Sequence, residues 1–106
     1  MVTVGVLAHF TFKAGSESAA EQFFQNGRIV VDQQPATTVW FAFRLGPTTY
    51  GAFAAFASDE DREALLSAGG PKMAQSNSDL FERPPSFERV DIVAARQVSN
   101  FCSESG

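Results

Sequence analysis

The sequence has little cysteine and no long apolar run. Cys102 is the only cysteine, so an intrachain disulfide is excluded and a reducing, cytoplasmic setting is expected. No segment approaches the roughly twenty apolar residues that a membrane-spanning helix needs, and no membrane partner is expected. The apolar residues 1–10 lack the charged start and the small-residue cleavage site of a secretory signal, so we expect them to belong to the fold.

Positive charge is also scarce. Eight Lys and Arg stand against twelve Asp and Glu, which gives a net charge of −4, and the basic residues are spread along the chain. Nucleic acid is therefore not expected as a partner, because phosphate binding needs clustered cations. The sequence has no metal-ligand cluster, no glycine-rich phosphate loop and no nicotinamide or flavin motif, so we predict neither a metal nor a cofactor.

Aromatic residues, in contrast, are plentiful. Eleven of the 106 residues are Phe, and 44% of the chain is hydrophobic, a composition that is typical of a globular protein with one core. We therefore assign residues 1–96 to a single domain and residues 97–106 to a polar C-terminal tail.

Short segments of β-branched and aromatic residues, several with period-two alternation, predict four strands. These strands cover residues 3–12, 37–45, 50–57 and 89–95. One helical region falls between the first and second strands, and a helix pair falls between the third and fourth. This order predicts the α+β ferredoxin-like arrangement βαββαβ, with a four-stranded antiparallel sheet.

Capping residues indicate where the helices begin. Ser18 and Glu21 form a capping box for the first helix, with Ser16 as a competing cap. Ser58 is expected to cap the second helix, since acidic residues follow it in the first turn. The third helix is expected over residues 71–83, where a proline opens it and a Pro-Pro pair follows it.

The hairpin of the second and third strands is apolar on both faces. Pairing Leu45 with Tyr50 gives one face with Phe41, Phe43, Ala52, Ala54 and Phe56, and an opposite face with Trp40, Ala42, Arg44, Gly51, Phe53 and Ala55. A slip by one residue would exchange the two faces. The helices can cover only one of them, so we expect a second copy of the chain to cover the other in a homodimer.

Residues 40–53 (WFAFRLGPTTYGAF) and 55–62 (AFASDEDR) resemble the antibiotic biosynthesis monooxygenase family, a set of dimeric α+β barrels. The resemblance covers about residues 3–95. It implies a dimeric α+β barrel with a small apolar pocket between the sheet and the helices. The family includes cofactor-independent enzymes that oxidise quinols or anthrone-like aromatics with molecular oxygen, haem-degrading relatives, and members without an assigned reaction.

The residues that mark two branches of this family are replaced here. The quinol-oxidising pattern has an acidic residue, a Trp and a helix His where this sequence has Ala54, Phe56 and Leu65. The haem-degrading branch uses a helix histidine to hold iron, whereas the only histidine here, His9, falls on a predicted strand. Haem is therefore not expected, and the resemblance leaves the reaction open.

Three side chains are candidates for chemistry. His9 can exchange a proton near neutral pH and is a candidate general base, although a lone histidine in an apolar strand is more often a packed residue. Trp40 and Arg44 share a strand face about 13 Å apart along the strand. The indole could stack on an aromatic substrate and the guanidinium could stabilise a phenolate or reduced oxygen. Alternatively, Trp40 fills the core or the dimer interface, and Arg44 pairs with an acid.

Four further residues are predicted to line a substrate pocket. Tyr50 opens the third strand at the turn, where its hydroxyl could also simply face water. Leu65, Met73 and Phe81 lie at helical spacing and would form an apolar wall, with core packing as the simpler interpretation.

Two classes of function follow from these features. The first is a cofactor-independent monooxygenase for a small electron-rich aromatic, quinol or anthrone-like, in which the substrate anion itself reduces oxygen. The second is a non-catalytic small-molecule-binding or accessory domain of the same fold, which the replaced branch residues favour. A cyclase-like or isomerase-like role also stays open.

Overall fold

A computed structural model describes residues 1–96, and the predicted tail with Cys102 lies outside the described residues. The elements are β1 (Val4–Phe12), α1 (Glu17–Asp32), β2 (Val39–Arg44), β3 (Thr49–Phe56), α2 (Asp59–Ala68), α3 (Gly70–Ser76), η1 (Ser78–Leu80) and β4 (Phe81–Asp91). The strands form one antiparallel sheet in the order β2-β3-β1-β4. This confirms the predicted α+β ferredoxin-like fold. No helix within residues 1–96 is long and apolar enough to cross a membrane.

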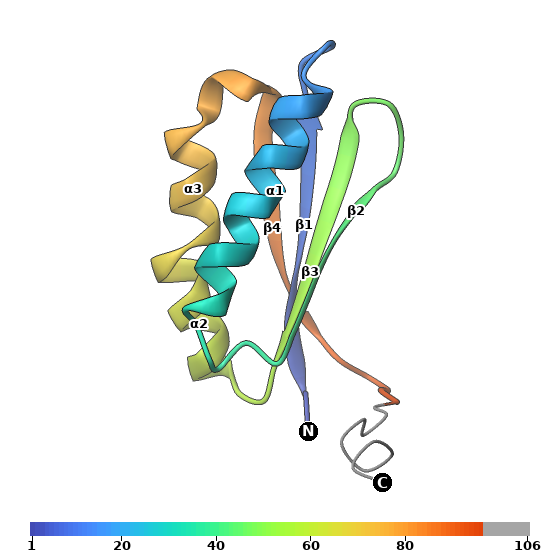
Figure 1. The fold of residues 1–106 in the computed structure, drawn as a ribbon. Helices are drawn as coiled ribbons and strands as arrows, with labels where there is room; N and C mark the ends of the chain where they lie inside the picture. Colours follow the sequence, from blue (N-terminus) through green and yellow to red (C-terminus); the bar gives the residue numbers. More distant parts are fainter. Residues whose placement is uncertain (97–106) are drawn as a thin grey trace, which may run out of the picture.

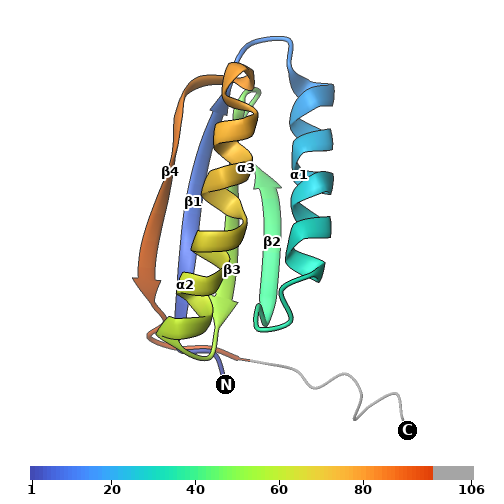
Figure 2. The same cartoon turned by 90° about the vertical axis from the view of Figure 1, so that its left-hand side faces the viewer.

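The helices form a single layer on one face of the sheet (Figure 1). Figure 2 shows α1 on the β2 side of this layer and the α2–α3 pair on the β4 side. Within residues 1–96, no helix lies on the opposite face of the sheet. The space between the two layers therefore holds the core.

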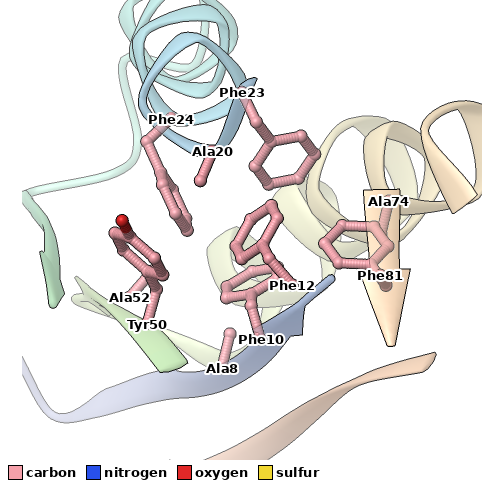
Figure 3. Close-up of a cluster of buried hydrophobic side chains, with 10 residues drawn as sticks. All are labelled: Ala8, Phe10, Phe12, Ala20, Phe23, Phe24, Tyr50, Ala52, Ala74 and Phe81. Atoms are coloured by element: carbon pink, nitrogen blue, oxygen red, sulfur yellow. The ribbon is translucent and has the colours of Figure 1, made fainter. Parts of the chain in front are cut away.

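The central strand β1 supplies most of the contact between sheet and helices. Its alternate residues, Val4, Val6, Ala8, Phe10 and Phe12, are all 9% exposed or less, as their period-two spacing predicts. The two Phe rings enter an aromatic cluster that also contains Phe23, Phe24, Tyr50 and Phe81 (Figure 3). Ring centroids in this cluster lie 4.9 to 6.4 Å apart, and most of the pairs meet edge to face. Such pairs add to the free energy of burial.

Of the predicted helix caps, one is confirmed and one is wrong. The Ser58 Oγ accepts a hydrogen bond from the Asp61 amide at 3.2 Å, so the predicted cap of α2 is confirmed. The predicted capping box of Ser18 and Glu21 is wrong, because α1 begins at Glu17 with Ser16 in the cap position. The Ser16 amide already donates to the Lys13 carbonyl across the preceding turn, which places Ser16 at the boundary without a side-chain cap.

The third helix is shorter than predicted and the last strand begins earlier. The helix ends at Ser76, and β4 begins at Phe81, whose ring fills the aromatic cluster. The strand continues through Pro84 and Pro85, two residues that the sequence analysis took as a helix end. It tolerates them because β4 is an edge strand, and its register with β1 is irregular where they lie.

The hairpin register differs by one residue from the expected pairing. Arg44, not Leu45, pairs with Tyr50, because the Leu45 and Gly46 amides both donate to the Thr49 carbonyl and close the turn. This slip exchanges the two faces of β2. Trp40, Ala42 and Arg44 therefore share the helix side with Tyr50, Ala52 and Ala54, while Phe41 and Phe43 lie on the open face.

The open face of the sheet is apolar along its β2 side. Phe41 is 61% and Phe43 37% exposed, and Phe53 is half-buried beside them. The Phe43 ring lies directly over Gly51, where any Cβ would collide with it. Glycine at this position thus lets the ring lie close to the sheet and keeps the face flat.

The aromatic cluster predicts a large stability cost for losing one central ring. Phe12 is 2% exposed and contacts five other aromatic rings, so Phe12→Ala should lower the free energy of unfolding by about 3 to 5 kcal/mol. The control Ile29→Ala, at a position 58% exposed on α1, should change it by less than about 0.5 kcal/mol. Urea unfolding followed by circular dichroism measures both, and equal effects would show that the cluster is not the core.

Candidate functional site

An apolar cavity lies between the sheet and the helix layer. Its wall is built from β1, β2, β3, β4 and all three α-helices, and every lining residue is aliphatic, aromatic, methionine or glycine. Its volume is about 70 Å³. An apolar cavity of about 150 Å³ can take up benzene, so a ring of that size requires some movement of the wall here. The cavity suits a small apolar molecule and offers no acid or base.

The structure brings three of the predicted site residues into this wall. Trp40 contributes from β2, Leu65 from α2 and Met73 from α3. Phe81 lies in the aromatic cluster instead, and its other side lines a groove between α3 and β4. Trp40 also lines a shallow outer hollow at the edge of the sheet, so its indole separates the cavity from the surface on that side.

Gly27 is a part of the site that is not among the residues predicted from the sequence. It lies in the middle of α1, where glycine costs about 0.5 to 1 kcal/mol relative to alanine. A Cβ there would lie 3.6 Å from the Trp40 ring and 4.0 Å from the Met73 Cε. The missing side chain therefore leaves open space opposite the indole.

His9 lies away from the cavity. It is exposed on the open face of the sheet, in the central strand, where it pairs with Gly51 on one side and Ser86 on the other. The sheet itself separates its imidazole from the helix side. His9 is thus neither packed in the core of this chain nor within reach of a ligand in the cavity.

Arg44 and Tyr50 line a second hollow, between α1 and the β2–β3 hairpin. The Arg44 Nε and Nη2 donate to the carbonyls of Gly46 and Pro47 at 3.0 and 2.9 Å, so the guanidinium pairs with the turn and not with an acid. Its Cζ lies 5.6 Å from the centre of the Tyr50 ring, a cation–π contact. Contrary to one expectation, Tyr50 does not face water, because it is buried.

Polar contacts fix the position of α2, which carries Leu65. The buried Arg62 donates to the carbonyls of Gly5 and Val90 at the end of the sheet. Arg89 on β4 donates to both carboxylate oxygens of Glu63, at 2.7 and 2.6 Å, and these hydrogen bonds lower the pKa of Glu63. Within residues 1–96, no three His, Cys, Asp or Glu side chains lie together as metal ligands would.

Comparison with solved structures shows the same architecture in several bacterial proteins. A protein of unknown function from Nitrosomonas europaea is 30% identical with a TM-score of 0.86, and the match covers 93% of this chain and 97% of that one. A proposed antibiotic biosynthesis monooxygenase from the same organism is 12% identical with a TM-score of 0.73, over 86% of this chain and 90% of that one. This chain therefore has the fold of proteins that are named as antibiotic biosynthesis monooxygenases.

One further similar structure is a variant of SnoaB from Streptomyces nogalater, a cofactor-independent oxygenase. It is 19% identical to this chain with a TM-score of 0.67, over 91% of this chain and 95% of that one. At such identities the likeness establishes the fold and not the reaction. No family model matches the sequence, and no curated protein matches it either.

Gly27 provides a direct test of the cavity. Trp40 is the only tryptophan, so its fluorescence reports on binding of a small probe such as toluene. Gly27→Leu should abolish the saturable fluorescence change, because the new side chain fills the space opposite the indole. Gly27→Ala should raise the free energy of unfolding by about 0.5 to 1 kcal/mol, since its Cβ makes an ordinary contact.

Asn26→Leu is the matched control for Gly27→Leu. It adds the same side chain to an exposed position on the same helix and should leave toluene binding unchanged. Wild-type binding by Gly27→Leu would show that the probe does not occupy this cavity.

Proposed function

We propose that this chain is a cofactor-independent oxygenase that binds a small electron-rich aromatic molecule in the apolar cavity. The composition of the cavity wall supports this most directly, because its described residues combine aromatic rings, among them the Trp40 indole, with aliphatic side chains, and none of them is titratable. Such a wall stacks a ring and keeps water out. In the proposed reaction the electrons come from the substrate itself. The shared fold with SnoaB, a cofactor-independent oxygenase, is consistent with this proposal.

The proposed reaction converts an activated methylene of an anthrone-like substrate to a carbonyl. The carbon loses two hydrogens and gains one oxygen atom from molecular oxygen, and the second oxygen atom leaves as water with those two hydrogens. Four electrons pass from carbon to oxygen, so no outside reductant is needed. The substrate reacts as its enolate, and its proton passes to water, since His9 lies on the other face of the sheet. The positive charge of Arg44 in the adjoining hollow favours the anionic oxygen.

The second candidate function is binding without chemistry. Ala54 and Leu65 line the cavity at the positions where the quinol-oxidising pattern carries an acid and a histidine. An apolar ligand would fit the same wall, and a carrier or accessory domain needs no proton-transfer group. Both candidate functions therefore place the ligand in the same cavity. They differ in whether molecular oxygen is consumed.

We also propose that the chain acts as a homodimer in the cytoplasm, with the open faces of two sheets in contact. The apolar side chains of this face include Leu7, Phe41, Phe43 and Phe53. Contiguous apolar surface of this kind is rarely left in contact with water, and a two-fold pairing of identical faces is the commonest way to bury it. Sheets that pack face to face lie about 10 Å apart, a spacing that aromatic side chains fill.

The dimer can be tested at Phe41. Because this ring is 61% exposed in the single chain, Phe41→Asp should leave the core intact but place a carboxylate in the interface, which opposes association by several kcal/mol. Analytical ultracentrifugation should give about twice 11.4 kDa for the wild type and the single-chain mass for Phe41→Asp. Ile29→Asp, on the outer side of α1, is the control and should remain dimeric. A monomeric wild type would contradict the proposal.

The reaction can be tested with an oxygen electrode and an autoxidisable anthrone or quinol. The metal-free protein should accelerate oxygen uptake, and Gly27→Leu should not. Trp40→Ala should raise the KM about five- to tenfold, because stacking acts on substrate and transition state alike. Arg44→Gln should lower kcat more than it raises the KM, since its charge acts on an anion that develops during the reaction. Toluene binding without any acceleration, across a panel of such aromatics, would favour the binding function.

A further inference from the structure

The hydroxyl group of Tyr50 is buried without a hydrogen-bond partner among the described residues. The ring is 5% exposed and packs against Phe12 and Phe24, with centroid distances of 5.2 and 5.5 Å. Phenylalanine would make the same ring contacts and would avoid burying an unpaired polar group, which costs free energy. The packing of the core therefore does not account for the oxygen atom.

The hollow between α1 and the β2–β3 hairpin, here called the polar hollow, lies next to Tyr50. Tyr50 lines the hollow, whose volume is about 410 Å³. One cation, Arg44, and one anion, Glu21, also line it, together with neutral polar side chains of α1. In Figure 3 the hydroxyl points away from Phe12 and Phe81, out of the aromatic cluster. Arg44 holds the Tyr50 ring in place through its cation–π contact.

The polar hollow adjoins the apolar cavity through Phe24. This side chain is in the wall of both, so one ring forms part of the partition between them. The Phe24 ring packs against four other aromatic rings, those of Phe10, Phe12, Phe23 and Tyr50. A rotation of this ring would connect the apolar space to the side of the hollow where Tyr50 lies.

We propose that Tyr50 selects the ligand by donating a hydrogen bond to an oxygen substituent on its ring. The ring occupies the apolar cavity, Phe24 turns aside, and the oxygen reaches the Tyr50 hydroxyl. This inference rests on the proposed binding of an aromatic molecule in the cavity. It narrows the ligand from any small apolar molecule to an aromatic that carries a phenolic or carbonyl oxygen.

Toluene and phenol form a suitable probe pair, because they have nearly the same shape and differ by a methyl and a hydroxyl group. Their affinities for the full chain are measured by Trp40 fluorescence, in the wild type and in Tyr50→Phe. Tyr50→Phe should weaken phenol binding about three- to tenfold and leave toluene binding unchanged. Its melting temperature without ligand should equal or exceed that of the wild type, whereas a tyrosine with a structural hydrogen bond would lose stability.

Thr37→Val is the matched control. Thr37 has the other buried hydroxyl without a partner among the described residues, and it lies outside the polar hollow. This variant should bind both probes as the wild type does. If Tyr50→Phe affects both probes equally or neither of them, the role of Tyr50 is refuted. If phenol binds in a Tyr50-dependent way while toluene does not bind the wild type, the role of Tyr50 is supported and the apolar cavity is refuted as the site of the ring. If neither probe binds, both the role of Tyr50 and the binding of an aromatic molecule in the cavity are refuted.

Discussion

The packing of Phe10 and Phe12 against α1 determines the spacing between the sheet and the helix layer. These two rings rise from the central strand and meet Phe23 and Phe24 edge to face. Because the rings are large, they hold the layers apart at the Tyr50 end of the sheet, while alanines line the neighbouring strand positions. The cavity lies beside this support, where alanine and glycine positions leave room between the rings. The same contacts that stabilise the fold thus create the space in which a ligand can bind.

Much of the fold could be predicted from the sequence because periodicity and capping are local signals. The buried positions of β1 and the cap at Ser58 follow from neighbours within a few residues. The course of the chain from Ser76 to Pro85 could not be predicted in this way. Whether Pro84 ends an element depends on whether its strand lies at an edge of the sheet, and strand order is a property of the whole fold.

The candidate site was predictable in its apolar part and not in its polar part. Trp40 and Met73 line the cavity because helical and strand spacing place apolar residues toward the core. Tyr50 is predicted to open the third strand with a hydroxyl that could face water, whereas its ring is buried on the helix side together with Ala52. The hydrogen bonds that close the hairpin shift the register of β2 by one residue and place Arg44 beside Tyr50. A one-residue slip costs little when both faces are apolar, so the pattern could not distinguish the two registers. The position of His9 could not be predicted either. It is on the open face of the sheet, and only the arrangement of the layers reveals this.

The prolines of β4 also limit how copies of this sheet can associate through their edges. Pro84 and Pro85 remove two amide donors from one edge strand, while the other edge, β2, keeps a regular six-residue strand. Growth into a continuous ribbon needs both edges of every molecule to accept a neighbour. The prolines therefore disfavour pairing of the β4 edge with β2 of another copy, whereas a pair of two β2 edges would close on itself. A preference for the closed pair opposes growth of edge contacts into a fibre.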